Sequence, residues 1–186
     1  MKMIAVKDLM VPLAEYATVS EEATLYEAYT ALEEAQNRLD RDRYLYLHRA
    51  VLVYDKNNNI IGKMSQLDAL KALEPKYAEM GDTRSISRAG FSPQFLKSML
   101  ESASLWENPL KDICSKAAGR KVKHFMHTPT EGEFIQMEAT LDEAIHLLLM
   151  GHHQSLLVKQ GGEIVGILRL TDVFAQVFHI MKSCEI

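Results

Sequence analysis

One short segment of this 186-residue chain has residue types and a spacing that could bind a phosphorylated nucleoside. Ser65 is followed three residues later by Asp68, and Gly62 precedes both. An aspartate in the first turn of a helix can accept hydrogen bonds from both ribose hydroxyls, and a hydroxyl residue at the helix start lies where free N–H groups favour phosphate. Glycine allows close approach to the backbone. The same Ser-x-x-Asp spacing is also an ordinary capping box that needs no ligand, and the local pattern leaves both interpretations open.

A second segment has the same layout but a different residue at one position. Arg169 precedes Asp172 by three residues, with Thr171 beside the aspartate and Gly166 upstream. A planar guanidinium matches phosphate oxygens well, so Arg169 could bind phosphate directly. It could equally fill the site and abolish it. We therefore expect Asp68 to mark the better ligand site.

These two segments are equivalent positions of an internal repeat. The sequence EATLxEA begins at Glu22 and again, 116 residues later, at Glu138. Further matches follow in the same order along both copies, although copy one carries about 11 extra residues between Leu32 and His48. The matched pairs are Val6 with Val122, Met10 with Met126, His48 with His153, Ile60 with Ile164, Gly62 with Gly166 and Asp68 with Asp172.

Each copy is predicted to fold as β-α-β-β-α. The first helix of each begins with a Thr-x-x-Glu capping box, at Thr24 and at Thr140. Two apolar segments then flank a turn, at 57–59 in copy one and at 161–162 in copy two, which predicts a β-hairpin. A helix is expected after each hairpin. The extra residues of copy one include a mixed-charge run at 38–43, which we interpret as a solvated extension of the first helix.

The two copies are separated by a predicted helical insert. We place copy one at 1–74, the insert at 75–120 and copy two at 121–186. Ser92-Pro93 predicts a helix start, and a second short helix is expected from Asn108-Pro109 to Gly119. An apolar stripe on the first of these helices must be covered, either by the repeats or by a second chain. Its members are Phe95, Leu96, Met99, Leu100 and Ala103.

Composition excludes several classes of function. Hydrophobic content of 47% and charged content of 25% are typical of soluble globular proteins. A net charge of −4 indicates no general affinity for nucleic acid or an anionic membrane. No apolar run reaches the ~20 residues of a membrane span, and we expect a cytoplasmic protein. The histidines of His124-x-x-His127 and His152-His153 lack partners at structural-zinc spacing, so we expect no metal. No nucleophile with its base can be assembled, so we expect no enzyme.

The segments 62–68 and 166–172 resemble the Gly-hydrophobic-x-Thr/Ser-x-x-Asp signature of cystathionine-β-synthase (CBS) domains. The openings 6–10 and 122–126, the capped Leu-x-Glu-Ala helices and the apolar hairpins resemble the same domain, in the same order, twice. The resemblance covers both copies but not the insert. It implies a mixed α/β (α+β) fold, in which two tandem CBS repeats pack around a pseudo-twofold axis as a Bateman module.

The resemblance also implies a class of ligand. CBS pairs commonly bind AMP, ADP or ATP, sometimes S-adenosylmethionine, in clefts between the repeats, and they often form homodimers. The pair His48-Arg49 is similar to a His-Arg pair that contacts phosphate in some nucleotide-sensing members. Copy two departs from this pattern, because Gln154 stands where copy one has Arg49.

Two hypotheses follow. In the first, the chain is a regulatory sensor without catalysis, in which Asp68 binds ribose while Ser65, His48 and Arg49 contact phosphate. Apolar residues around Met10 to Pro12 and the hairpin would hold the adenine. In the second, it is a structural adaptor with degenerate clefts that dimerises and docks a protein partner not identified by the sequence. An enzyme acting on nucleotides is a third class that no motif supports.

Overall fold

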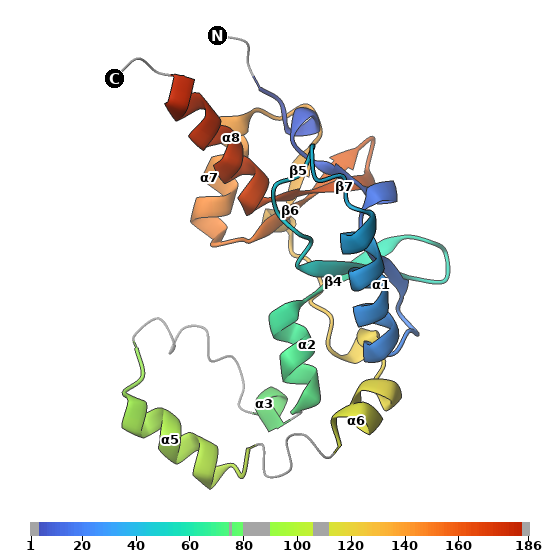
Figure 1. Ribbon diagram of the computed structural model, residues 1–186, viewed down its shortest axis with the longest axis vertical. Helices are drawn as coiled ribbons and strands as arrows, with labels where there is room; N and C mark the ends of the chain where they lie inside the picture. Colours follow the sequence, from blue (N-terminus) through green and yellow to red (C-terminus); the bar gives the residue numbers. More distant parts are fainter. Residues whose placement is uncertain (1–3, 75, 80–89, 106–111, 184–186) are drawn as a thin grey trace.

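The computed structural model describes residues 4–74, 76–79, 90–105 and 112–183, which form two sheets with their helices (Figure 1). Copy one contains η1 (Val6–Asp8), β1 (Val11–Pro12), η2 (Leu13–Glu15), β2 (Thr18–Ser20), α1 (Leu25–Arg38), β3 (Ala50–Tyr54), β4 (Ile60–Ser65) and α2 (Gln66–Leu73). The insert contains α3 (Lys76–Glu79), α5 (Pro93–Ser102) and α6 (Ile113–Gly119). Copy two contains η3 (Val122–His124), η4 (Glu131–Glu133), β5 (Phe134–Gln136), α7 (Leu141–Gly151), β6 (Ser155–Gln160), β7 (Glu163–Arg169) and α8 (Leu170–Ser183).

Each copy has the predicted β-α-β-β-α order. In copy one β2 pairs in parallel with β3, and β3 pairs antiparallel with β4. In copy two β5, β6 and β7 pair in the same way. The hairpin turns use backbone conformations that asparagine and glycine tolerate best, with φ of 63° at Asn58 and 58° at Gly161. The capping boxes predicted at Thr24 and Thr140 are both present.

The opening segment of each copy hydrogen-bonds to the other copy. Residues near the start of copy one reach the turn before α7, and their equivalents in copy two reach the turn before α1. The backbone hydrogen bonds occur in pairs that the repeat relates, so the two copies are related by a pseudo-twofold axis. The paired bonds are Val6 N to Ala139 O (2.9 Å) with Val122 N to Ala23 O (2.8 Å), and Leu141 N to Ile4 O (3.0 Å) with Leu25 N to Arg120 O (2.8 Å). The paired bridges are Val11 to Ile167 and Lys63 to His127.

Each hydrophobic core also contains a residue from the opening segment of the other copy. Val122 of copy two is buried in the core of copy one, and Val6 of copy one is buried in the core of copy two. A third cluster belongs to both copies and lies between their sheets. Its buried members are Val11, Tyr16, Leu39, Tyr44, Leu52, Leu157 and Ile167. Neither copy therefore has a complete core of its own.

The extra residues of copy one are not a helix extension, so that prediction was wrong. Helix α1 ends at Arg38, and the chain turns where Asp40 Oδ1 accepts hydrogen bonds from the backbone N–H groups of Asp42 and Arg43. Leu39 and Tyr44 are buried in the cluster shared by the two copies. Burial of these two side chains draws the segment inward while the charged side chains between them stay exposed.

The insert agrees with the prediction where it is described. Helix α5 begins at Pro93, and Ser92 Oγ accepts a hydrogen bond from Phe95 N. Helix α6 ends at Gly119 as expected. Its expected start at Asn108-Pro109 lies outside the described residues.

Gly166 is expected to tolerate alanine poorly, because a Cβ there would lie 2.5 Å from the carbonyl oxygen of Val11 in the crossing segment. Such overpacking costs about 1–3 kcal/mol, so Gly166→Ala should lower the free energy of unfolding by that amount in urea denaturation. Gly119→Ala is the matched control, since a Cβ there meets nothing within 4 Å. Equal stability of the two variants would contradict the close approach of Val11 to β7.

Candidate functional site

The Asp172 site is closed by a side chain of its own copy. Arg169 Nε and Nη2 donate to the two carboxylate oxygens of Asp172, at 2.5 Å and 2.6 Å. The third nitrogen, Nη1, donates to the carbonyl oxygen of Tyr46 at 2.9 Å and to His48 Nδ1 at 3.0 Å. Arg169 is only 5% exposed. Thr171 lies half-buried in the first turn of α8 beside this pair. A ribose could reach Asp172 only by displacing a buried, bidentate ion pair.

His48 completes this closure as a neutral side chain. A guanidinium only donates, so His48 Nδ1 is the acceptor and Nε2–H donates to the carbonyl oxygen of Glu15, 3.2 Å away. The ring is fully buried and lies 4.4 Å, centroid to centroid, from the ring of Tyr16. Burial, together with the charge of Arg169, lowers the pKa of His48 to about 4. His48 therefore supports the Arg169–Asp172 pair without carrying charge.

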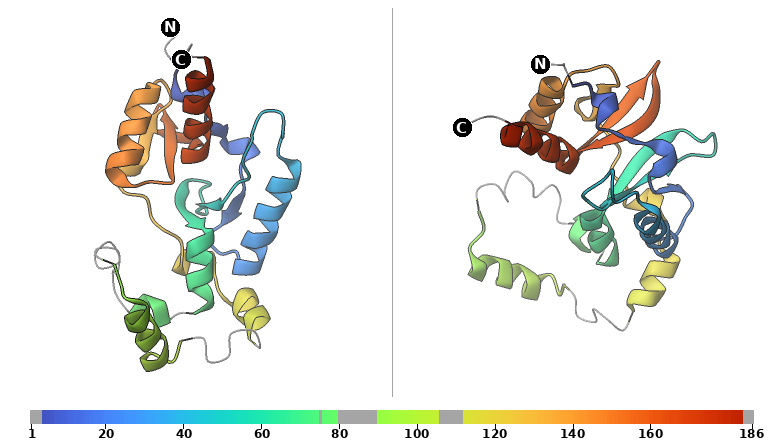
Figure 2. Two further views of the ribbon diagram at one scale, coloured as in Figure 1. Left: turned by 60° about the vertical axis from the view of Figure 1, so that its left-hand side comes forward. Right: turned by 45° about the horizontal axis from the view of Figure 1, so that its top comes forward.

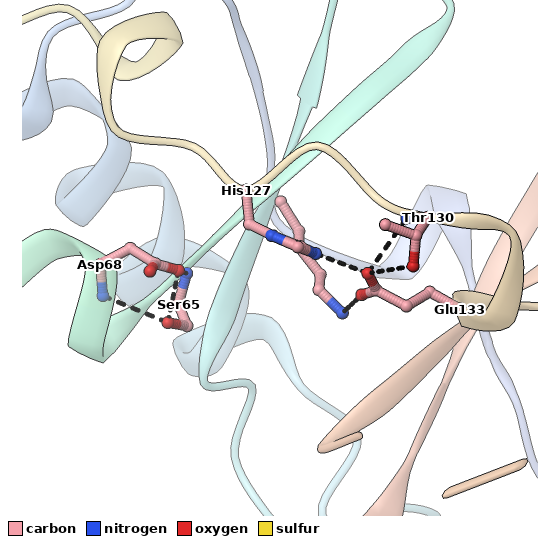
Figure 3. Close-up of polar contacts among 6 residues, drawn as sticks. Ser65, Asp68, His127, Thr130 and Glu133 are labelled. Carbon is pink, nitrogen blue, oxygen red and sulfur yellow. Dashed lines mark hydrogen bonds and ion pairs between the residues drawn. The ribbon is translucent and has the colours of Figure 1, made fainter. Parts of the chain in front are cut away.

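The Asp68 site keeps a free acceptor. Asp68 Oδ2 accepts hydrogen bonds from Ser65 Oγ (2.6 Å) and Ser65 N (3.0 Å), so the capping box expected from the sequence is present (Figure 3). In the described part of the chain no group donates to Asp68 Oδ1. The carbonyl oxygen of Arg49 accepts from Gln66 N at 3.2 Å, which places Arg49 at the start of α2 with its side chain exposed. The structure thus brings the backbone of Arg49 to the start of α2, which carries Asp68, and puts His48 against Arg169, the partner of Asp172.

The pseudo-twofold axis shows how the two sites differ. Ser65 occupies the position equivalent to Arg169, and Gly132 occupies the position equivalent to Tyr16. His153 is the counterpart of His48, and its Nε2 would lie 3.8 Å from a Cβ on Gly132. Copy two also lacks the segment that supplies Tyr46 O to Arg169. The Asp68 site therefore has a smaller residue in place of Arg169 and of Tyr16, whereas both sites keep the histidine.

A buried ion-pair cluster around Glu133, beside the Asp68 site, was not predicted from the sequence. Glu133 is 3% exposed, and its carboxylate pairs with Lys63 Nζ at 2.6 Å and with His127 Nε2 at 2.5 Å (Figure 3). Thr130 N also donates to it, at 3.1 Å. Burial alone would raise the pKa of Glu133, but the hydrogen bonds of Lys63 and His127 outweigh it and hold that pKa at about 2. The cluster joins β4 of copy one to η4 of copy two. No local spacing in the sequence could have paired Lys63 with Glu133.

The described residues contain no group of three or more His, Cys, Asp or Glu side chains placed to hold a metal ion. His127 instead pairs with Glu133, and His153 packs near Gly132. Among the helices of the described ranges, none is long and apolar enough to cross a bilayer.

Comparison with known proteins identifies the fold. The CBS domain family model matches residues 6–75 and 122–179, which is more than half of the chain. The chain belongs to the CBS domain family. With two matched regions it is a CBS pair, a type of regulatory module, and its mixed α+β architecture is that of the family. No curated protein matches the chain.

Several solved structures share the fold of this CBS pair at low sequence identity. CBSX2, a CBS-pair protein from Arabidopsis thaliana, has 20% identity and a TM-score of 0.61, with 98% of this chain and 100% of that chain covered. A structure of CBSX2 in complex with AMP has 20% identity and a TM-score of 0.57, covering 95% and 98%. The CBS domain of a membrane protein from Sphaerobacter thermophilus has 18% identity and a TM-score of 0.60, covering 94% and 88%.

Because of His48, the free energy of unfolding should fall as the pH is lowered into the mildly acidic range. Its pKa in the folded state, about 4, lies below its usual value of 6.5. The neutral ring therefore stabilises the fold fully above pH 6.5, and this contribution, at most ~3 kcal/mol, is lost as pH falls through 4. The lowered pKa of Glu133 changes the free energy of unfolding only below about pH 4.5, outside this range. Urea denaturation between pH 6.5 and 4.5 should show a falling unfolding free energy in the parent chain and a flatter one in His48→Gln.

His146, exposed on α7, provides the control for this measurement. His146→Gln should keep the slope of the parent chain. An unchanged slope in His48→Gln would mean that His48 is not held neutral by Arg169.

Proposed function

We propose that this CBS pair is a regulatory module that binds an adenine nucleotide, AMP, ADP or ATP, at the Asp68 site and acts by binding alone. The observation that carries the proposal is the difference between the two aspartates. Both oxygens of Asp172 are taken by Arg169, whereas Asp68 Oδ1 receives no hydrogen bond within the described residues. We take residues 1–74 and 121–186 as the two halves of the module, with 75–120 as the insert.

The residues around Asp68 suit the parts of a nucleotide. The carboxylate of Asp68 lies in the first turn of α2, where it can accept from ribose hydroxyls. Ser65, at the N-cap, and the exposed Arg49 lie at the positive end of the same helix, where phosphate is favoured. The structure of CBSX2 with AMP supports a ligand of this class. S-adenosylmethionine shares the ribose but lacks phosphate, so it would not use Arg49.

The site also lies where a ligand could regulate. β4 and α2 carry Ser65 and Asp68, and β4 is tied to copy two through Lys63 and Glu133. A ligand shifts a conformational equilibrium only if it binds one state better than another. A nucleotide on Asp68 would favour the arrangement in which the two copies are joined as described.

Ligand binding should raise the melting temperature. A nucleotide at 100 times its dissociation constant stabilises by ~2.7 kcal/mol, which is roughly 5–10 °C for a chain of this size. AMP, ADP, ATP and S-adenosylmethionine are each tested by differential scanning calorimetry. Asp68→Asn should abolish the shift, and Arg49→Gln should weaken it for phosphorylated ligands only.

A matched control separates loss of binding from loss of the helix cap. Glu143 caps α7 as Asp68 caps α2, so Glu143→Gln is the same kind of change away from the site. Glu143→Gln and Asp172→Asn should keep the ligand-dependent shift. Absence of any shift with all four ligands, or a shift that survives Asp68→Asn, would refute nucleotide binding at this site.

A second candidate function is a structural adaptor that dimerises and docks a protein partner. The closure of the Asp172 site by Arg169 favours it, since one of the two clefts no longer offers its ligand residues. The exposed apolar side chains of α2 and α5 favour it as well. No ligand-dependent shift, combined with concentration-dependent association, would select this candidate over the sensor.

A further inference from the structure

The segment that crosses β4 next to the Asp68 site comes from copy two. His127 lies opposite Lys63 of β4, and the two residues exchange backbone hydrogen bonds of 2.8 Å and 3.0 Å. The chain that leads from α6 into copy two passes β4 in this way (Figures 1 and 2). Residues 10–12, which the sequence led us to expect beside an adenine on Asp68, instead cross β7. The segment around His127 is therefore the one that borders a ligand on Asp68.

Three polar side chains stand beside the Asp68 site at positions whose equivalents in the other site are apolar and buried. Replacing apolar residues by a buried ion pair of similar size is often neutral or destabilising, so stability alone does not account for this difference. The equivalent pairs are His127 with Val11, Lys63 with Ile167, and Glu133 with Ala17. The polar cluster is thus a property of the Asp68 site and not of the fold.

Strand geometry turns this cluster toward the ligand residues. Side chains two apart on a strand share a face, so Lys63 and Ser65 point to the same side of β4. Directly opposite residues of an antiparallel pair also share a face, which puts His127 on that side too. Figure 3 shows His127 between the pair Ser65–Asp68 and Glu133. The side chain of His127 is 35% exposed, against 4% for Glu133, so His127 is the member that a ligand can reach.

Glu133 fixes the proton of His127 on one nitrogen. His127 Nε2 lies 2.5 Å from Glu133 Oε1, and an ionised carboxylate only accepts, so Nε2 carries the proton. The other oxygen of Glu133 pairs with Lys63 Nζ at 2.6 Å, which balances the charge of the carboxylate. In the neutral ring Nδ1 is then an acceptor, and within the described residues no group donates to it. The cluster therefore holds one oriented hydrogen-bond acceptor at the edge of the site.

We propose that His127 selects 6-amino purines over 6-oxo purines at the Asp68 site, a specificity that rests on the nucleotide binding proposed above. A nucleoside whose ribose hydroxyls bind Asp68 directs its base along β4 past Ser65 toward Lys63, and two strand residues span ~7 Å, comparable to the length from ribose to the far edge of a purine. There the 6-amino group of adenine donates to His127 Nδ1. A 6-oxo purine presents a second acceptor to the same nitrogen, so the two lone pairs repel.

Three nucleotides that differ at position 6 of the purine test this assignment. AMP has an amino group there, purine riboside 5′-monophosphate has a hydrogen, and IMP has an oxo group. Isothermal titration calorimetry on the parent chain should give affinities that fall in this order, with about tenfold or more between AMP and IMP. AMP binding no tighter than IMP would overturn the role of His127 and leave the nucleotide site standing. No binding of any of the three would overturn the nucleotide site itself, and this specificity with it.

His127→Gln removes the acceptor but keeps a donor for Glu133, because the amide nitrogen of glutamine takes the place of Nε2. This variant should bind AMP and IMP with similar affinity, chiefly because AMP binds more weakly. The matched control is His124→Gln, at an exposed histidine three residues upstream, which should keep the affinity ratio of the parent chain. A folded His127→Gln chain that keeps the full ratio would overturn the proposal. Thermal melting shows whether the variant folds, and if it does not, the order of the three nucleotides in the parent chain still decides.

Discussion

The structure depends on the exchange of opening segments between the two copies. A sheet of three strands with two helices on it leaves part of its core open, and each copy closes the core of the other with a valine, Val6 or Val122. The backbone bonds around these valines satisfy groups that would otherwise be unpaired at the starts of α1 and α7. The crossing segments also explain why Gly62 and Gly166 precede the two aspartates. A Cβ on either glycine would collide with the segment that crosses it.

The exchange creates two equivalent sites, and the residues placed there have made them unequal. In one, the guanidinium of Arg169 pairs with both carboxylate oxygens of Asp172, and His48 and the Tyr46 carbonyl hold it in place. In the other, Ser65 is too short to fill the corresponding space and bonds only the near oxygen of Asp68. A buried ion pair is strongly destabilised when one partner is removed, so the Arg169–Asp172 pair resists opening. The duplication supplies the symmetry of the fold, and these substitutions give the two aspartates different hydrogen-bond partners.

Local features were predictable from the sequence because they depend on nearby residues. The repeat, the capping boxes at Thr24 and Thr140 and the hairpins follow from short spacings, and the CBS family was identified by the resemblance of short motifs to its signature. The segment after Arg38 was misread because the burial of Leu39 and Tyr44 depends on β6 and β7 of the other copy. The grouping of His48 with Arg169, and of Lys63 with Glu133, likewise depends on contacts between copies that no local pattern encodes. The sequence shows that Arg169 stands where copy one has Ser65. Only the hydrogen bonds of Arg169 show that it closes the Asp172 site.

Hydrogen exchange of the crossing amides tests the mutual completion of the two copies most directly. The amides of Val6 and Val122 donate to Ala139 and Ala23 across the pseudo-twofold axis. Native-state exchange in increasing denaturant should give both amides an opening free energy close to that of global unfolding, and both should respond to denaturant alike. Exchange of either amide through a low-energy local opening, or separate loss of protection in the two copies, would show that each copy folds without the other.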